Sequence, residues 1–350
     1  MKMSEMQEVM EREEKVEKVS KIVDVENLSK TFGKLKAVDG ISFDIKEGEI
    51  FGFLGPNGAG KSTTINMLTT LLKPTSGKAT IVGYDIHKQS NEVRRNVGVV
   101  PQEYTADEDL TGLQNILLCA DLYGLPRSNS KPHAMELLKL VELEDAANRK
   151  VSTYSGGMRR RLELASGLIN YPRLLFLDEP TLGLDVQTRA AVWKYIRMLK
   201  EEYHMTLFLT THYLEEADSL CDRIAIIDHG HIIKIGTPEQ LKASIGGDVI
   251  DVGVKEDAPD ISSDIAKLKL VKDVKKSANE YRIKAELGEE ASPQIMDLIR
   301  SKGLHVTKIS LTKPSLDEAY LELTGRNIRE EESSKMEMFS QRITMMRARR

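Results

Sequence analysis

Residues 55–63 combine several glycines with a lysine and two hydroxyl side chains. The segment consists of Gly55, Pro56, Asn57, Gly58, Ala59, Gly60, Lys61, Ser62 and Thr63. Its glycines let successive backbone N–H groups turn inward, which suits the β- and γ-phosphates of a nucleotide at a helix N-terminus. Lys61 would neutralise these phosphates, and the Ser62 hydroxyl would ligate Mg²⁺. A glycine-rich turn without function is the alternative. The strand-like run 49–54 and the apolar helical run 64–72 favour a phosphate-binding loop.

Two carboxylates follow a second apolar run, 174–177, which is predicted to be a buried parallel strand. Asp178 would hold Mg²⁺ through its water shell, and Glu179 would orient and deprotonate the attacking water. A solvated strand end is the alternative, but Pro180 and Thr181 follow at once. Together with the phosphate-binding loop, the pair predicts hydrolysis of a bound nucleotide.

A further anion site is predicted between these two motifs. Ser155 is a good N-cap, and Gly156 and Gly157 leave backbone N–H groups uncovered before a helical run that ends near Ile169. The arginines 159–161 would face acidic partners or phosphates, or else lie on a solvent-exposed helix face. One chain would therefore have two phosphate sites.

The elements that must position these residues alternate along the chain. Runs typical of strands are 22–28, 41–45, 50–54, 79–82, 97–100, 174–177, 206–209, 223–227 and 232–235. Helical stretches between them predict an α/β core over 21–245 with an antiparallel β portion near its start. The helical runs 110–123 and 134–141 predict a helical subdomain inserted at about 103–170.

A smaller α+β domain is predicted over 246–325, after the Gly246-Gly247 boundary. Strand-like runs at 248–254, 281–285 and 305–311, a stretch ending at 268–274 and a helix at 293–302 give a βαββαβ-like order. The segments on either side of the two domains, 1–20 and 326–350, are predicted to be flexible. The basic, methionine-rich tail at 326–350 is a disordered end or contacts an anionic membrane surface.

Composition favours an ordinary globular protein and gives no support for several other classes. In 350 residues, 40% apolar and 30% charged side chains are typical of a globular protein, and the net charge of −4 gives no basic excess for nucleic acid. Cys119 and Cys221 lie in apolar segments, so they are expected to be core residues in a reducing compartment. Residues 1–20 are polar and acidic, unlike a signal peptide, and no apolar run reaches the roughly 18 residues of a membrane span. We therefore expect a cytoplasmic chain unless a partner holds it at a membrane.

The motifs, in this order, resemble those of the ATP-binding cassette (ABC) ATPases. In that family the segment matching Ser155, Gly156, Gly157 and Met158 is the signature motif, which seals the γ-phosphate held by another copy's phosphate loop. The resemblance implies that Phe32 stacks on adenine, Gln102 reaches the Mg²⁺ and the attacking water, and Asp185 lies in the loop crossing the dimer interface. His212 matches the switch histidine that holds the γ-phosphate and Glu179 in line, although a structural histidine is the alternative.

The resemblance implies a P-loop NTPase cassette with a RecA-like core, ATP and Mg²⁺ as cofactors, and a homodimer formed on ATP. Three positions depart from the family pattern. Tyr154 and Met158 replace the usual Leu and Gln of the signature, so the glutamine contact is lost while Ser155 and the backbone donors remain. Phe32 replaces the usual tyrosine but keeps a ring face for stacking.

The type of cassette is indicated by two segments. Residues 110–126 resemble the part of a transporter cassette that grips a membrane subunit's coupling helix. Residues 314–325 resemble the closing segment of daunorubicin and multidrug resistance exporter ATPases, which pair with a separate ABC-2 type permease; an amphipathic helix is the structural alternative. The resemblance implies a peripheral protein at the cytoplasmic face of the membrane with drug or lipid-like cargo. A soluble regulatory cassette acting on ribosomes or nucleic acid is the other hypothesis, although no nucleic acid is expected.

Overall fold

The computed structural model describes residues 21–244, 247–255 and 259–325. Its contacts divide the chain into two units between Ile233 and Lys234, and each unit is described by itself. The predicted extensions 1–20 and 326–350 lie outside the described residues.

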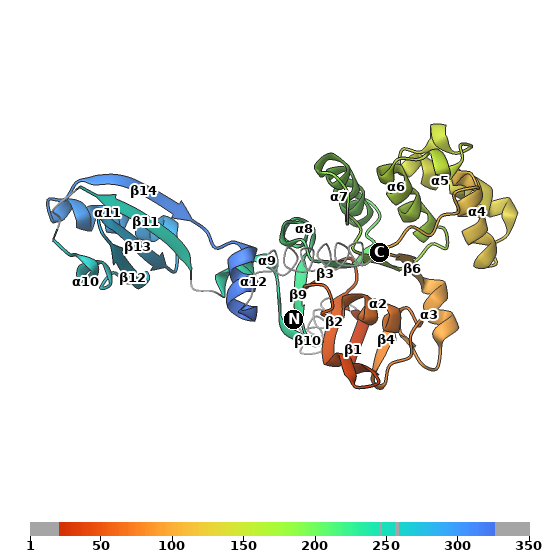
Figure 1. The fold of residues 1–350 in the computed structure, drawn as a ribbon, viewed down its shortest axis with the longest axis horizontal. Coiled ribbons are helices and arrows are strands. Elements are labelled where there is room, and N and C mark those ends of the chain that lie inside the picture. Colours follow the sequence, from red (N-terminus) through yellow and green to blue (C-terminus); the bar gives the residue numbers. More distant parts are fainter. Residues whose placement is uncertain (1–20, 245–246, 256–258, 326–350) are drawn as a thin grey trace, which may run out of the picture. The chain divides into compact units, whose positions relative to one another are not determined.

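A six-stranded sheet of order β10-β9-β3-β8-β7-β6 forms the centre of the first unit (Figure 1). Its strands are β3 (Ile50–Leu54), β6 (Val97–Val100), β7 (Leu174–Asp178), β8 (Thr206–Thr211), β9 (Arg223–Asp228) and β10 (His231–Gly236). The pairs β3·β8, β3·β9, β7·β8 and β6·β7 are parallel. Strands β3, β7 and β8 are buried throughout, which explains their nearly continuous apolar sequences. The carboxyl ends of these strands therefore meet at one edge, where polar side chains that follow them are brought together.

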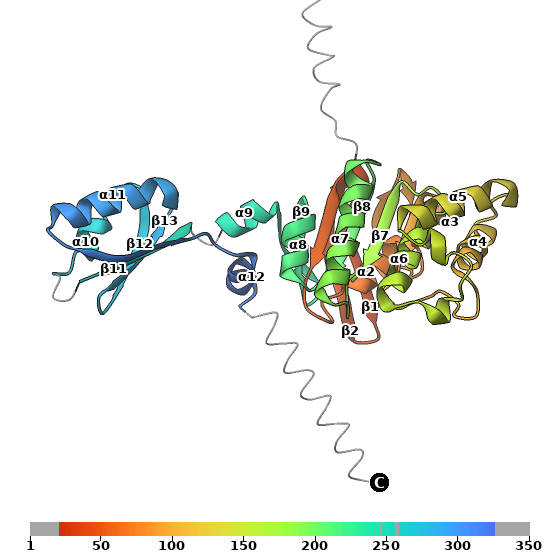
Figure 2. The ribbon, with the colours of Figure 1, turned by 90° about the horizontal axis from the view of Figure 1, so that it is seen from above.

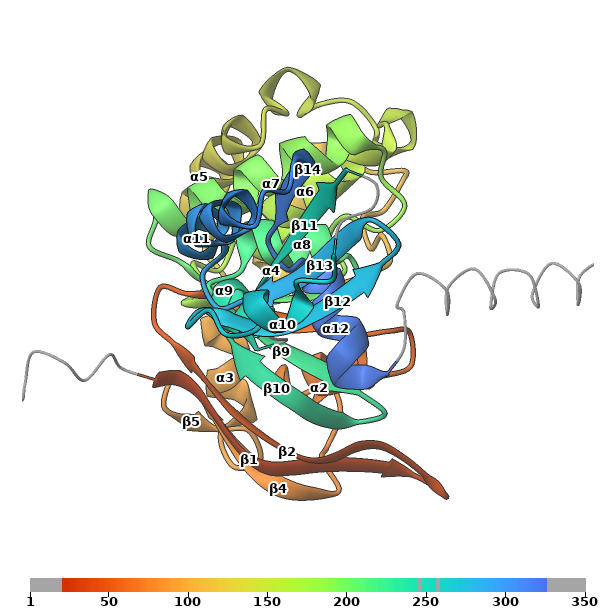
Figure 3. The ribbon, with the colours of Figure 1, turned by 90° about the vertical axis from the view of Figure 1, so that its left-hand side faces the viewer.

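The predicted antiparallel β portion forms a separate four-stranded sheet of order β2-β1-β4-β5. It contains β1 (Lys21–Phe32), β2 (Leu35–Lys46), β4 (Ser76–Ile81) and β5 (Tyr84–Asp85). All three of its pairings are antiparallel. Figure 3 shows β1, β2 and β4 as a layer apart from the helices α5, α6 and α7.

The helices of the first unit flank the central sheet and form the inserted subdomain. They are α2 (Lys61–Leu68), α3 (Ser90–Asn96), α4 (Gly112–Leu122), α5 (Arg127–Leu140), α6 (Gly156–Gly167), α7 (Val186–Glu201) and α8 (Leu214–Leu220). Helices α4, α5 and α6 pack on one another as the predicted helical subdomain, and α8 packs on β3 and β8 (Figure 2). Helix α5 begins earlier than the predicted run 134–141 because it accommodates Pro132 within its first turns. In the first turn, the N–H and the hydroxyl of Ser130 both donate to Pro126 O.

The second unit contains the predicted βαββαβ order. Its elements are β11 (Asp248–Val254), α10 (Ser262–Ile265), β12 (Val271–Ser277), β13 (Glu280–Ala285), α11 (Gly288–Ser301) and β14 (Val306–Thr312). The sheet order is β12-β13-β11-β14, and every pairing is antiparallel. Helices α9 (Pro238–Ala243) and α12 (Leu316–Thr324) contact each other beside this fold. Helix α11 starts five residues before the predicted Pro293, where Gly288 N donates to Asp248 Oδ2 at 2.7 Å.

The helices α10 and α11 cover one face of this sheet, and alternate strand residues form its core. In β13, Tyr281, Ile283 and Ala285 are fully buried, whereas the intervening Arg282 is exposed. This alternation is the period-2 pattern of a strand with one covered face.

The substitution Ile283→Ala is expected to destabilise the second unit, because it leaves a cavity under α11. Such changes cost about 2–5 kcal/mol of unfolding free energy. Chemical denaturation followed by circular dichroism measures the effect. Arg282→Ala is the matched control, and its stability should stay within about 0.5 kcal/mol of the parent. Equal losses for the two variants would contradict the assigned faces of β13.

Candidate functional site

The predicted phosphate-binding loop connects β3 to α2 at the carboxyl edge of the central sheet. Gly60 is the N-cap of α2 and has φ of 105°, and Gly58 has φ of 90°. A Cβ at Gly60 would lie 2.6 Å from Ala37 O, so both the conformation and the space require glycine there. The loop therefore has the curled backbone that the sequence predicts.

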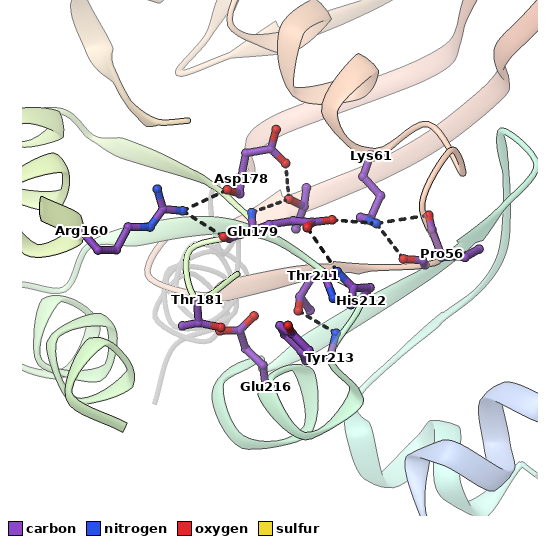
Figure 4. A network of polar contacts seen from close by, with 12 residues as sticks. Pro56, Lys61, Arg160, Asp178, Glu179, Thr181, Thr211, His212, Tyr213 and Glu216 are labelled. Atoms are coloured by element: carbon purple, nitrogen blue, oxygen red, sulfur yellow. Dashed lines mark hydrogen bonds and ion pairs between the residues drawn. The ribbon is translucent and has the colours of Figure 1, made fainter. Parts of the chain in front are cut away.

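Lys61 is buried, and its ammonium group lies among oxygen atoms of two motifs. Its Nζ donates to Gly55 O at 2.7 Å and to Pro56 O at 3.2 Å. It also forms an ion pair with Glu179 Oε1 at 3.0 Å (Figure 4). The fold thus brings together a lysine and a carboxylate that are far apart in the sequence.

The two carboxylates at the end of β7 have different partners. Asp178 Oδ1 accepts a hydrogen bond from Thr210 Oγ1 at 2.5 Å, and the same hydroxyl accepts from Glu179 N at 3.0 Å. Glu179 Oε2 lies 3.2 Å from His212 Nδ1, in the residue that follows β8. Glu179 has φ of 48°, a left-handed conformation that is strained for a residue with a side chain.

The charge state of Glu179 follows from competing effects. Burial raises the pKa of its carboxyl group, but the hydrogen bond with His212 and the positive charge of Lys61 together outweigh burial and lower the pKa below its ordinary value. Glu179 is therefore ionised at neutral pH, which is the form that can accept a proton.

A cavity of about 360 Å³ lies over the loop, and most of the predicted nucleotide-binding residues line it. Its lining residues are Phe32, Leu35, Ala37, Asn57, Gly58, Gly60, Lys61, Ser62, Thr63, Gln102 and Glu179. The ring of Phe32 is about half exposed, with Lys30 Nζ 5.1 Å from its centroid. The loop residues Gly55, Pro56 and Ala59 are buried below this cavity.

The predicted signature segment lies elsewhere on the first unit. Ser155 is the N-cap of α6, its Oγ accepts from Met158 N at 3.3 Å, and Ser155 and Gly156 are exposed. None of the residues 155–158 is among those that line the cavity. Asp185 is the exposed N-cap of α7, where its carboxylate accepts from Thr188 N at 2.9 Å and Thr188 Oγ1 at 2.8 Å. A Cβ at Gly157 would lie 2.6 Å from Thr188 Cγ2, so the two helix starts are neighbours.

The sequence prediction for the arginines 159–161 is wrong for Arg160. This side chain is buried and donates to the carbonyl oxygens of Pro101, Asp178, Glu179 and Pro180. A run of three arginines on a helix gave no signal of burial, since arginine is mostly exposed in folded proteins. In the structure Arg160 is buried together with Leu162, Glu163, Leu164, Ala165 and Gly167 of α6. Its neighbours have different surroundings, since Arg159 pairs with the exposed Glu108 and Arg161 donates to Val141 O at 3.0 Å.

Two buried glutamates were also missed by sequence reasoning. Glu163 accepts from Thr105 N, Thr105 Oγ1 and Ala106 N at 2.7–2.9 Å, which fixes the loop after Gln102. Glu216 accepts from Thr181 Oγ1 at 2.8 Å and Trp193 Nε1 at 2.9 Å, which joins α8 to the segment after Glu179. Burial raises the pKa of Glu216 against these hydrogen bonds. The helical spacing predicted apolar residues at such positions, so charged side chains there carried no recognisable signal.

Comparison with known proteins covers both units. The ABC transporter family matches residues 38–182, and the C-terminal domain of DrrA1-3-like ATP-binding proteins matches residues 236–324. The daunorubicin resistance ATP-binding protein DrrA3 of Streptomyces coeruleorubidus is 40% identical over 314 residues, 89% of this chain and 98% of that protein. The linearmycin resistance ATP-binding protein LnrL of Bacillus subtilis (strain 168) is 39% identical over 313 residues, 88% of this chain and 100% of that protein.

The chain belongs to the ABC transporter family of ATP-binding proteins. It is an ATPase subunit of the exporter type, and the ribosome or nucleic-acid alternative is not favoured. A dimeric structure of the cassette MJ0796 in a post-hydrolysis state, with ADP and phosphate, has a TM-score of 0.56 and 30% identity, covering 61% of this chain and 98% of that one. The reported relatives of this ABC subunit are thus resistance ATP-binding proteins, and the MJ0796 cassette is a dimer in its own structure. Among the described residues, no helix is both long and apolar enough to cross a bilayer.

The substitution Lys61→Ala is expected to weaken ATP binding by this ABC subunit, because it removes the ammonium group from the cavity. A hydrogen bond to a charged group contributes about 1.5–3 kcal/mol, so the affinity should fall about 10- to 100-fold. Titration with a fluorescent ATP analogue measures it. Lys88→Ala, at an exposed position, is the matched control. An unchanged dissociation constant for Lys61→Ala would contradict the phosphate-loop assignment.

Proposed function

We propose that two copies of this ATPase bind two Mg·ATP between them and, by closing and reopening, drive an ABC-2 type permease that exports a drug or lipid-like compound. The observation that carries the proposal is that the predicted site residues lie in two separate places on the chain. The loop, Gln102 and Glu179 line one cavity, whereas Ser155 and Asp185 are exposed outside it. A second copy that supplies Ser155 and its backbone donors would complete the site.

Glu179 is the general base in this proposal. Its carboxylate is ionised, buried and held between Lys61 and His212, so it is suited to orient and deprotonate a water that attacks the γ-phosphate. His212 keeps the carboxylate and the γ-phosphate in line, which is positioning catalysis. Lys61 changes partners when ATP binds, from Glu179 to the phosphates, and this exchange releases the base for the water.

The donor set around the cavity fits Mg²⁺. Ser62 and Gln102 line the cavity and offer hydroxyl and amide oxygens, and Asp178 offers a carboxylate at the end of β7. In the described residues no group of three or more His, Cys, Asp or Glu side chains is arranged to hold a metal. A hard cation here therefore depends on these three residues together with the nucleotide phosphates and water, as Mg²⁺ generally does. When bound, it would neutralise charge that develops on the phosphates.

Closure depends on the γ-phosphate. ATP would contact the phosphate loop of one copy and, through its γ-phosphate, Ser155 at the start of α6 in the other copy. ADP lacks the γ-phosphate and so cannot bridge the two copies. ATP therefore favours the closed dimer by its differential contacts, and hydrolysis removes that preference. The dimeric MJ0796 cassette supports this arrangement as a relative.

The permease is proposed to dock on the helical subdomain. A cavity of about 470 Å³ between α4 and α5 is lined by Leu110, Gln114, Leu117, Leu118, Asp121, Arg127 and Lys131. Leu118 and Leu122 of α4 are exposed beside it, which gives an apolar surface with a charged rim. Such a surface suits an amphipathic helix of a membrane subunit. Relatives named for daunorubicin resistance, linearmycin resistance and Nod factor export support the proposal of a drug or lipid-like cargo.

The substitution Glu179→Gln is expected to lower turnover by about 10²–10⁴-fold, since it removes the general base. ATP binding should persist, so this variant should form a dimer in Mg·ATP. Size-exclusion chromatography with light scattering measures the dimer, and phosphate release measures turnover. Adding Ser155→Arg to Glu179→Gln should abolish the dimer while leaving ATP binding intact. A normal dimer in that double variant would rule out the shared site.

Export is tested by recovery of a partner. Tagged Glu179→Gln purified with Mg·ATP from detergent-solubilised cells should bring with it a polypeptide with several membrane spans, identified by mass spectrometry. Leu118→Asp should reduce this recovery because it charges the proposed docking surface. Leu71→Asp, at an exposed leucine outside the α4–α5 cavity, is the control. Recovery of ribosomes or DNA-bound proteins without a membrane protein would overturn the proposal.

A further inference from the structure

Arg160 lies at the centre of a set of backbone carbonyls that no motif predicted. Its Nε donates to Pro180 O at 2.6 Å, and its Nη1 donates to Pro101 O at 2.6 Å. Its Nη2 donates to Asp178 O at 3.1 Å and to Glu179 O at 2.9 Å (Figure 4). One buried guanidinium therefore binds three consecutive carbonyls of the turn that carries both carboxylates.

This turn has a conformation that needs support. Glu179 has φ of 48°, and its N–H donates to Thr210 O at 3.1 Å and to Thr210 Oγ1 at 3.0 Å. Its carbonyl on the other side is held by Arg160. A strained backbone persists only when surrounding contacts fix it. Thr210 thus binds the N–H of Glu179 and Arg160 binds its carbonyl, so the peptide groups before and after this residue are both held, and the direction of its side chain toward Lys61 follows from that backbone.

We propose that Arg160 is a positioning residue for ATP hydrolysis, because it holds the Asp178–Pro180 turn so that the Glu179 carboxylate points at the attacking water. The inference rests on the proposed role of Glu179 as the base. Arg160 is not among the residues that line the cavity, and its guanidinium donates to backbone carbonyls that include that of Glu179, so we infer that it acts through Glu179. Arg160 lies on α6, the helix that begins after its N-cap Ser155. In the proposed dimer it would therefore connect the Asp178–Pro180 turn of one copy to the Ser155 segment that the same copy presents to its partner.

The chemistry requires arginine at this position. A guanidinium has five N–H donors in a fixed plane, which can bind several carbonyls that converge from one side. A lysine ammonium has three donors on a flexible stem and would satisfy only part of the set. Arg160→Lys is therefore expected to keep the fold and to position Glu179 less well, whereas Arg160→Met removes every donor.

The test compares single-turnover ATP hydrolysis of Arg160→Met and Arg160→Lys with that of the parent chain. The rate constant should fall about 10- to 100-fold for Arg160→Met, as for a misplaced catalytic group. Arg160→Lys should have an intermediate rate, and both variants should bind the fluorescent ATP analogue with parental affinity. Arg159→Met is the matched control, since Arg159 pairs with Glu108 away from the turn, and its rate should be parental. Parental rates for Arg160→Met, or for Arg160→Lys if Arg160→Met does not fold, would overturn the inference.

A double-mutant comparison separates positioning from a general loss of folded protein. In the Glu179→Gln background the base is already absent, so Arg160→Lys should lower the residual rate by much less than it does in the parent. An equal reduction in both backgrounds would overturn the inference. The proposed function is judged separately, because parental turnover by Glu179→Gln alone would remove Glu179 as the base whatever Arg160 does.

Discussion

The ion pair between Lys61 and Glu179 is the interaction on which the rest of the site depends. Both side chains are about 95% buried, and a buried charge is costly unless it is paired and hydrogen-bonded. The chain meets this cost with carbonyls of Gly55 and Pro56 for the lysine and with His212 for the carboxylate. These partners come from the loop after β3 and from the end of β8. Burial of either charge therefore requires the parallel sheet that holds these segments together.

Other charges in the first unit are buried in the same way. Arg160 is held by carbonyls, Glu163 by N–H and hydroxyl groups after Gln102, and Glu216 by Thr181 and Trp193. Each of these side chains fixes an irregular segment, where regular secondary structure leaves backbone groups without partners. The loops around the cavity are thus held by charged side chains from the helices behind them. This explains how loops can hold the proposed catalytic groups in place without being part of the sheet.

The second unit achieves its stability by different means. Its sheet has one face covered by α10 and α11 and a core of aliphatic side chains around Tyr281. Strand β13 alternates between buried and exposed residues, and the elements follow one another along the chain in the βαββαβ order that the sequence predicts. The match to the C-terminal domain of DrrA1-3-like proteins places this unit with exporter ATPases. The catalytic residues proposed for the chain all belong to the first unit.

The sequence by itself determined the strands β3, β6 and β11 and the curled glycine-rich loop before α2. These features depend on local patterns: apolar runs, glycines before a Lys-Ser pair, and N-caps such as Ser155. The starts of α5 and α11 were predicted too late, because each helix continues across a proline that the sequence suggests as a boundary. Helix α5 begins with the local bonds of Ser130 to Pro126 O, and α11 begins where Gly288 N donates to the distant Asp248 carboxylate.

Only the tertiary structure decided how the site is assembled. The distances of 3.0–3.2 Å that join Glu179 to Lys61 and His212 link residues from three separate strand ends. The left-handed conformation of Glu179 and the burial of Arg160 likewise have no signature in neighbouring residues. They depend on carbonyls and hydroxyls that approach from distant segments, and a sequence pattern describes only the periodicity of one segment. The long-range hydrogen bonds that compensate buried charge are therefore a property of the tertiary structure alone.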